Sequence, residues 1–241
     1  MSHNFELLMQ IETEPAAKGD HPAAEASRPV AKLLAPTDVG GKEMLRLVQS
    51  VFLSANGSAP RQVVFCGVDA ENGSSSVCAS AGRTLAANSS RSVCLVDANV
   101  RSPRLSSIFR VGTTIPFLGK STSVRELCVQ ISGNLWLAGT DMLVDDRGVL
   151  VSVDEVRHLL AELRGAFDYV LIDAPGTGVC GDAAILSQVA DAAVLVIEAN
   201  CTRRHTARKA KEALDAAGVR LLGTVLHNRL FPIPEGLYRR L

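Results

Sequence analysis

Net charge is the first thing that the sequence lacks. Its 241 residues hold 25 lysines and arginines against 25 aspartates and glutamates, so the formal charge at pH 7 is zero. Proteins that coat nucleic acids depend on an excess of positive charge, and this balance excludes nucleic acid as the main partner. Hydrophobic residues make up 47% of the chain, which excludes a wholly disordered protein and suits one large α/β domain.

Long hydrophobic runs are also missing. Runs such as residues 192–197 (AAVLVI) are far shorter than the ~18 apolar residues that a membrane-spanning helix needs. The first residues, MSHNFELLMQIETEP, are acidic and contain no small-residue cleavage site, so we expect no secretory signal. These absences predict a soluble, cytoplasmic protein.

Cysteine pairs at metal-binding spacing are absent as well. The six cysteines are scattered, with no CxxC pair and no His-x-x-x-His partner, so we expect no zinc site. Cys66 and Cys94 lie inside apolar runs, where a small buried side chain is the expected role, and no disulfide is expected. The others are Cys78, Cys128, Cys180 and Cys201.

The N-terminal residues differ from the rest of the chain. Residues 1–12 contain a short apolar cluster at roughly helical spacing, which is too short to form a helix alone in water. Residues 13–41 are rich in Ala, Pro, Glu, Gly and Ser and predict a flexible linker. We therefore expect residues 1–12 to dock, either on a partner or neighbouring subunit or on their own domain, and residues 42–241 to form that domain. The apolar side chains of the cluster are Phe5, Leu7, Leu8 and Ile11.

Apolar runs of strand length alternate with helical patterns beyond this point. The runs are nearly continuous, which is typical of a parallel sheet buried on both faces. Their alternation with helices predicts a doubly wound, mainly parallel α/β sheet flanked by helices. The predicted strands are residues 62–67, 92–97, 134–138, 168–173, 192–198 and 220–226. The predicted helices are residues 42–55, after a break at Gly40 and Gly41, and residues 75–88, 152–165, 181–188 and 202–217.

Polar residues follow three of the predicted strands, where ligands bind in doubly wound folds. The first strand leads into a polar turn and a helix of small residues, the layout of a phosphate-binding loop. The second strand ends at Asp97 and the fourth at Asp173. The turn, called the phosphate loop below, consists of Gly73, Ser74, Ser75 and Ser76.

The two strand-end aspartates are the candidate catalytic residues. A single aspartate at such a place more often only caps a turn. Two of them at neighbouring strand ends above a phosphate loop would hold Mg²⁺ together with Ser75 and orient a water or hydroxyl. Their joint presence favours the functional interpretation of Asp97 and Asp173.

Several motifs in order resemble one family. DYVLIDAP and the stretch from DAAILSQVADAAVLVIEAN to VLHNR resemble the C-terminal half of the bacterial tyrosine kinases. These are deviant P-loop ATPases related to MinD and ParA that work in capsule and exopolysaccharide biosynthesis. LVDANVRSPRLSSIF resembles the extra Walker motif of this family, usually of the form IDADLRxP, and GKEMLRLVQSVF resembles its ExxRxxR oligomerisation helix. The resemblance covers about residues 42–241, and several motifs in order are more specific than one alone.

The resemblance implies a cofactor, partners and further site residues. The cofactor is ATP or ADP with Mg²⁺, bound by the phosphate loop with Arg101, and with Asn228 at the adenine. The implied partner is a membrane polysaccharide co-polymerase, a chain-length regulator, which would bring the chain to the inner membrane. The helix at residues 42–55 implies a homo-oligomer.

The chain also departs from the family pattern. Ser74 stands where the family has the lysine that reaches the phosphates, and no lysine occurs between Lys42 and Lys120. A lysine about 4 Å from a phosphate contributes up to ~4 kcal/mol at an effective dielectric of 20, and serine contributes none of it. Arg101 is one cation that could reach the gap, whereas Arg83, two turns along the helix, is expected to face solvent. Asn99 replaces the usual second aspartate, and Gln49 replaces the last arginine of the oligomerisation helix.

Tyrosine, the expected substrate, is nearly absent. The chain has two tyrosines: Tyr169 in a predicted buried strand, and Tyr238 as the one possible acceptor in the tail. Three functions stay open. The first is a catalytically degenerate regulator or scaffold, and the second is a weak Mg-ATP-dependent autokinase or ATPase. The third, a positioning ATPase of the MinD or ParA type, lacks a terminal membrane-targeting helix rich in Lys and Arg.

Overall fold

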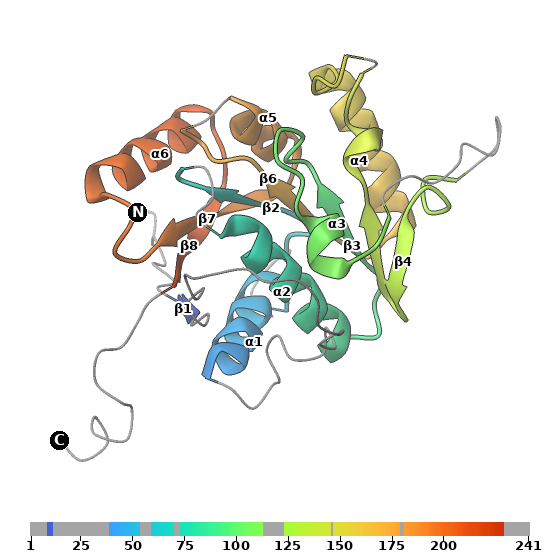
Figure 1. Ribbon diagram of the computed structural model, residues 1–241, viewed down its shortest axis with the longest axis horizontal. Coiled ribbons are helices and arrows are strands. Elements are labelled where there is room, and N and C mark those ends of the chain that lie inside the picture. The colour runs from blue at the N-terminus through green and yellow to red at the C-terminus, as the bar shows by residue number, and fades with distance from the viewer. Residues whose placement is uncertain are drawn as a thin grey trace, which may run out of the picture.

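The computed structural model describes residues 9–11, 39–53, 59–69, 73–112, 123–145, 147–178 and 181–228. Its centre is an eight-stranded sheet in the order β1-β8-β7-β2-β6-β3-β5-β4 (Figure 1). Neighbouring strands pair in parallel except β4 and β5, which are antiparallel. The predicted doubly wound, mainly parallel sheet is confirmed.

The described elements follow the predicted order closely. The strands are β1 (Met9–Ile11), β2 (Gln62–Gly67), β3 (Val93–Asp97), β4 (Val129–Ser132), β5 (Leu135–Ala138), β6 (Tyr169–Ala174), β7 (Ala192–Glu198) and β8 (Leu221–His227). The helices are α1 (Val39–Phe52), α2 (Ser74–Asn88), α3 (Leu105–Phe109), α4 (Val153–Ala166), α5 (Asp182–Val189) and α6 (Arg204–Ala216), with a 3₁₀ turn at Thr140–Met142. None of the helices in the described residues is long and apolar enough to cross a membrane.

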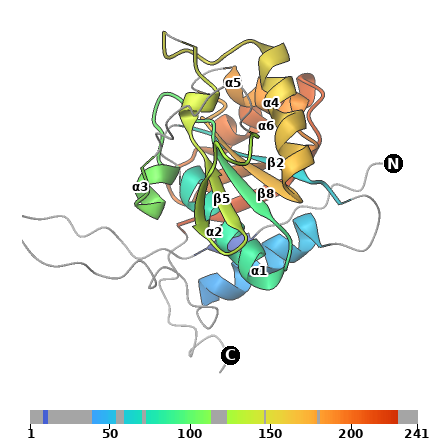
Figure 2. The same ribbon diagram turned by 90° about the vertical axis from the view of Figure 1, so that its right-hand side faces the viewer.

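Helices cover both faces of the sheet (Figure 2). Helices α1 and α2 lie on one face with α3 beside them, and α4, α5 and α6 lie on the other. Side chains of a strand alternate between the two faces, so in β2 Val63 and Phe65 pack toward α1 and α2, whereas Val64 and Cys66 pack toward the opposite helices. Both faces are therefore apolar, which explains why β2 is a continuous apolar run.

Helix α1 begins three residues earlier than predicted. Gly40 and Gly41 lie in its first turn rather than forming a break before it. The helix is amphipathic, and its apolar side chains, spaced three and four residues apart, are buried against the sheet and α2. This burial outweighs the helix-weakening effect of two glycines near its start. The buried side chains are Met44, Leu47, Val48, Val51 and Phe52.

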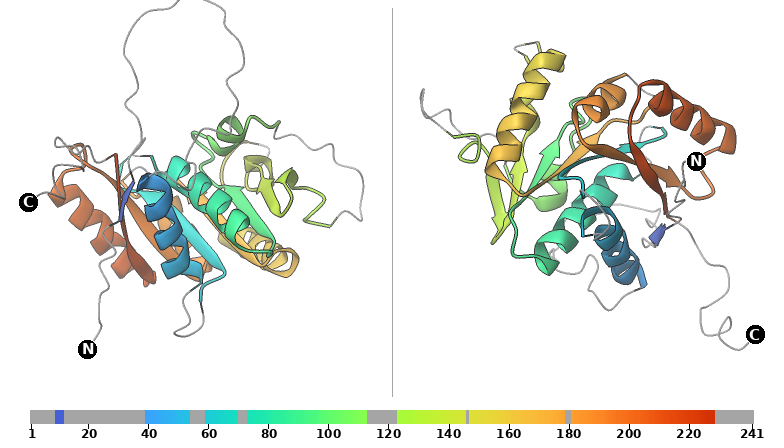
Figure 3. Two further views of the ribbon diagram at one scale, coloured as in Figure 1. Left: turned by 90° about the horizontal axis from the view of Figure 1, so that it is seen from below. Right: turned by 180° about the vertical axis from the view of Figure 1, so that it is seen from behind.

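Strand β1 extends the sheet at the edge next to β8. Its backbone pairs in parallel with β8, Met9 with Val225 and Ile11 with His227, and the strand lies beside α1 (Figure 3). Residues 9–11 thus join this chain's own sheet, and the helical spacing of the apolar cluster does not describe them. The exposed edge of β8 offers backbone partners that a short isolated helix lacks. Residues 1–8 and 12–38, with most of the predicted linker, lie outside the described residues.

The cysteines are where the apolar runs placed them. Cys66 and Cys94 are fully buried in β2 and β3. The five cysteines that the structure describes are all free, and of these only Cys201 is exposed. They act as small core side chains.

Candidate functional site

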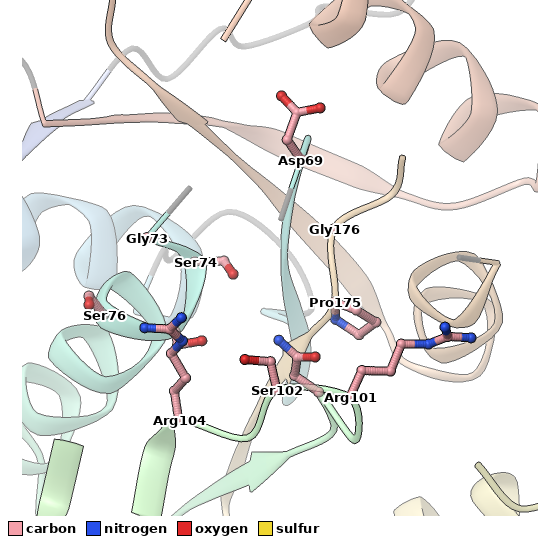
Figure 4. A pocket seen from close by; sticks show the side chains of 11 residues that line it. Asp69, Gly73, Ser74, Ser76, Arg101, Ser102, Arg104, Pro175 and Gly176 are labelled. Carbon is pink, nitrogen blue, oxygen red and sulfur yellow. The ribbon is translucent and has the colours of Figure 1, made fainter. Parts of the chain in front are cut away.

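A pocket of about 380 Å³ opens at the carboxyl edge of the sheet, outside the ends of β2, β3 and β6 (Figure 4). Five predicted residues line it: Gly73, Ser74, Ser75, Ser76 and Arg101. Six residues that were not predicted as site residues also line it: Asp69, Asn99, Ser102, Arg104, Pro175 and Gly176. The structure thus brings the phosphate loop and the loops after β3 and β6 around one space, as doubly wound folds do.

The phosphate loop forms the start of α2. Gly73 is the residue before the helix, and its carbonyl accepts the first helical hydrogen bond, from the Val77 amide at 3.0 Å. The amides of the first turn have no acceptor within the helix and give this end a partial positive charge. Ser74 and Ser75 are buried there. The loop therefore presents backbone donors suited to a phosphate, without a lysine.

Two features of position 73 require glycine: its backbone conformation and the lack of space for a side chain. Its φ of 80° lies in the left-handed region, which side chains disfavour. A Cβ at this position would also overlap the imidazole ring of His227, the last residue of β8. His227 is buried and its Nδ1 has no hydrogen-bond partner. The loop conformation thus depends on close backbone approach to a side chain from another strand.

The two candidate catalytic aspartates lie side by side at the edge of the sheet where the pocket opens, but neither is among the residues that line it. Asp97 of β3 and Asp173 of β6 are partners in the parallel register, and both are fully buried. Strand alternation places their side chains on the same face as Leu95 and Leu171, which pack toward α2. The carboxylates therefore lie on the face of the sheet where α2 begins.

Three of the four carboxylate oxygens have no hydrogen-bond partner: Asp97 Oδ1 and both oxygens of Asp173. Asp97 Oδ2 accepts a hydrogen bond from the Leu105 amide at 2.9 Å. Asp97 thus plays part of the capping role that was the structural alternative for it. Asp173 has no such role, and a buried, unpartnered carboxylate requires a cation or a proton.

The pKa values of the two aspartates are raised, because both carboxyl groups are buried. Burial raises the pKa of Asp173 to about 8, opposed in part by the nearby Ser75 hydroxyl. Burial raises the pKa of Asp97 to about 6, opposed by backbone amides that include that of Leu105. Each carboxylate is more easily protonated than a surface aspartate, because its charged form is poorly solvated.

The oxygen ligands near the pocket suit Mg²⁺ that is bound together with a phosphate, and they are too few to hold a metal ion by themselves. Mg²⁺ prefers oxygen ligands and is commonly held by one or two carboxylates together with substrate phosphates. Asp97, Asp173 and the Ser75 hydroxyl offer such oxygens. The described residues contain no group of three His, Cys, Asp or Glu that could hold a metal. An ion here would therefore depend on a bound phosphate for further ligands.

Two arginines from the loop after β3 line the pocket, and they point differently. Arg104 extends toward Ser74 and Ser76, whereas the guanidinium of Arg101 is directed away from these serines (Figure 4). Arg83 does not simply face solvent as expected, because it is half-buried with its guanidinium 4.4 Å from the centre of the Phe109 ring. The sequence signal for Arg104 was its place three residues after Arg101 in a strand-end loop.

Two predicted residues stand apart from this pocket. Asn228 is not among its lining residues, and its side-chain amide donates to Glu198 at 3.1 Å. Its contact with adenine stays a prediction. Tyr238 lies outside the described residues, and Tyr169 is half-buried in β6 with its ring edge-on to Phe52.

No protein-family model matches the chain, but individual proteins of known name are similar to it in sequence. Tyrosine-protein kinase YwqD of Bacillus subtilis is 31% identical over 147 residues, which are 59% of this chain and 62% of YwqD. Tyrosine-protein kinase CpsD of Streptococcus agalactiae is 28% identical over 138 residues, 55% of this chain and 60% of CpsD. The chain is similar in sequence to these bacterial tyrosine kinases. It spans about three fifths of the length of these curated relatives.

Several solved structures share the fold of this chain. The chimerical protein CapA2B2 has a TM-score of 0.73 and 18% identity, covering 93% of this chain and 94% of CapA2B2. The kinase domain of ETK from Escherichia coli has a TM-score of 0.70 and 16% identity, covering 93% and 92%. MinD of Pyrococcus horikoshii, complexed with Mg-ADP, has a TM-score of 0.56 and 21% identity, covering 69% of each chain. The resemblance to bacterial tyrosine kinases and their MinD-like fold is confirmed.

Proposed function

We propose that this relative of the bacterial tyrosine kinases binds Mg-ATP or Mg-ADP but has lost most of its phosphoryl transfer. It would act as a regulator or scaffold of a membrane polysaccharide co-polymerase in capsule or exopolysaccharide production. One observation carries the proposal: the phosphate loop lines the pocket and the buried aspartate pair lies at the same edge of the sheet, while Ser74 occupies the position of the phosphate-reaching lysine.

The free energies involved explain why nucleotide binding could persist while phosphoryl transfer is lost. The missing lysine is worth up to ~4 kcal/mol, whereas the end of α2 contributes at most ~2 kcal/mol toward an anion. Weakened binding survives such a loss. Phosphoryl transfer depends almost wholly on stabilising charge in the transition state, so it suffers more. Asp97, Asp173 and Ser75 would hold the Mg²⁺ that neutralises phosphate charge.

Helix α1 is the element through which we propose that the chain forms a homo-oligomer. Helix α1 carries the first two positions of the oligomerisation pattern, Glu43 and Arg46, which form an ion pair at 2.6 Å within the chain. Arg46 is 67% exposed, and Gln49 at the third position is also exposed. A homo-oligomer through α1 and docking on a membrane co-polymerase at the cytoplasmic side follow from the relation to the kinases.

A second candidate function is a weak Mg-ATP-dependent autokinase or ATPase. The retained aspartate pair favours it, because the Asp173 carboxylate is buried without a hydrogen-bond partner. A positioning ATPase has no comparable support, because the likeness to MinD concerns the fold.

Nucleotide titration tests the proposal. ATP and ADP are titrated by calorimetry with and without Mg²⁺, and phosphate release is followed in parallel. We expect Mg²⁺-dependent binding with negligible hydrolysis. Ser74→Lys should raise affinity at least tenfold, since ~1.4 kcal/mol is a factor of ten, whereas Ser74→Met, which adds bulk without charge, should not. Robust turnover by the unaltered protein that Asp173→Asn abolishes would establish the kinase alternative instead.

A further inference from the structure

The phosphate loop lacks its cation, but the pocket does not lack positive charge. Its lining contains two cationic side chains, Arg101 and Arg104, both from the loop after β3. Arg101 directs its guanidinium away from the serines of the phosphate loop, and Arg104 reaches toward Ser74 and Ser76 (Figure 4). Arg104 is therefore the lining cation that faces the start of α2.

The backbone of Arg104 is anchored. It is the residue before α3, and its carbonyl accepts a hydrogen bond from the Ile108 amide at 2.9 Å. The next amide, of Leu105, donates to the buried Asp97 carboxylate at 2.9 Å. The side chain thus extends from a fixed point on the side of the pocket opposite the phosphate loop.

Arg104 lines the same pocket as Ser74 and Ser75. Its positive charge also interacts with the buried carboxylate of Asp173. The guanidinium therefore lies close to the space that a Mg²⁺-bound phosphate would occupy. Its planar fork of donors suits phosphate oxygens bidentately.

We propose that Arg104 replaces the missing phosphate-loop lysine as the cation that holds the terminal phosphates of the bound nucleotide. The inference rests on the proposed nucleotide binding and adds the residue that supplies the charge. Arg104 acts from the loop between β3 and α3 instead of from the start of α2.

The competing role for Arg104 is that of a counter-ion to Asp173. The two roles differ in what a substitution changes. Loss of a counter-ion lowers the stability of the fold, whereas loss of a phosphate contact lowers affinity in proportion to the number of phosphates on the ligand.

Titrations with Mg-ATP, Mg-ADP and AMP separate these roles. We expect Arg104→Gln to weaken Mg-ATP and Mg-ADP binding by about 10- to 100-fold, the range of a charge-assisted hydrogen bond, and AMP binding by less than about threefold. Arg104→Lys keeps the charge and should retain most of the affinity. Ser74→Lys should restore affinity in the Arg104→Gln protein, because the lysine supplies the same charge from the loop.

The control is Arg91→Gln, which removes one positive charge at the opposite end of the sheet, where Arg91 forms an exposed ion pair with Asp168. Its affinities should match those of the parent. If the parent binds Mg-ATP and Arg104→Gln binds equally well, the inference fails while the proposed function stands. Equal losses for AMP and Mg-ATP would also overturn it, because the pocket as a whole would then have changed. A parent that binds no nucleotide overturns both.

Discussion

Asp173 combines two properties that oppose each other. Its carboxylate is fully buried with no hydrogen-bond partner for either oxygen, which is costly in the folded protein without a ligand. The same unpaired carboxylate is what a Mg²⁺ ion would need as a ligand. Stability in the free state is thus reduced by a group suited to the bound state, as is common at binding sites.

Asp173→Asn should therefore stabilise the protein in buffer free of Mg²⁺ and nucleotide. The folded-state pKa is raised to about 8 from 3.8, so between these values the carboxyl is protonated when folded and ionised when unfolded. The stability of the unaltered protein then falls as the pH rises through that window, by at most ~1.4 kcal/mol per pH unit. The asparagine variant lacks this dependence.

Urea unfolding at pH 5, 7 and 8.5 measures the effect. We expect the gain from Asp173→Asn to increase with pH and to reach about 1 to 3 kcal/mol at pH 8.5. Asp97→Asn is the comparison, with a smaller gain expected, because Asp97 Oδ2 accepts from the Leu105 amide. An asparagine variant less stable than the parent at pH 8.5 would show that Asp173 already has a compensating partner.

At the scale of elements, the start of α2 depends on β8. Gly73→Ala should destabilise the protein by about 2 kcal/mol or more, from the left-handed φ and from overlap with the His227 ring. Adding His227→Ala removes the overlap but keeps the φ strain, so the double variant should lose less than the sum of the single losses.

Urea unfolding of the four proteins in this cycle gives the coupling between the two elements. Gly165→Ala is the control, because Gly165 lies in α4 with open space where a Cβ would be, and alanine favours helix there. Strictly additive losses for Gly73→Ala and His227→Ala would contradict the packing described.

The central strands could be predicted to within one residue because both faces of the sheet are covered. β2 and β7 match residues 62–67 and 192–198 at both ends. Edge strands have no such signal: β4 alternates between half-buried and exposed residues, and β1 has three residues whose pairing with β8 is a long-range event. Continuous apolar runs identify strands in the middle of a parallel sheet and miss those at its margins.

The site could be predicted in part for a related reason. The phosphate loop lines the pocket, and Asp97 and Asp173 lie together at the same edge of the sheet, because parallel strands bring their carboxyl ends to one edge. Arg104 was missed because the direction of a long side chain across a loop is set by the anchoring of α3, which spacing does not reveal. Asn228 is placed by its contact with Glu198 from β7, a partner 30 residues away.

At the scale of the whole molecule, β1 joins the N-terminal residues to the far edge of the sheet. Deleting residues 1–12 should lower the melting temperature by about 2–8 °C, corresponding to a loss of 1–2 kcal/mol. The deletion also leaves the backbone groups of β8 unpaired, so self-association at high concentration should increase.

Thermal melts and sedimentation at several concentrations measure both effects. An unchanged melting temperature together with loss of partner capture would instead support the other alternative, in which this segment docks on a partner or neighbouring subunit. A deletion of residues 1–6, which leaves β1 intact, is the matched control and should behave like the full chain.

His227 stands where three parts of the molecule meet. It pairs in register with Ile11 of β1 on one side and with Glu198 of β7 on the other, and its ring packs on Gly73. During evolution this position is therefore not free to drift alone. A larger side chain at 227 would meet a glycine that cannot become smaller, and a smaller one would leave the left-handed φ of Gly73 in place, so inherited variation should be restricted at both positions.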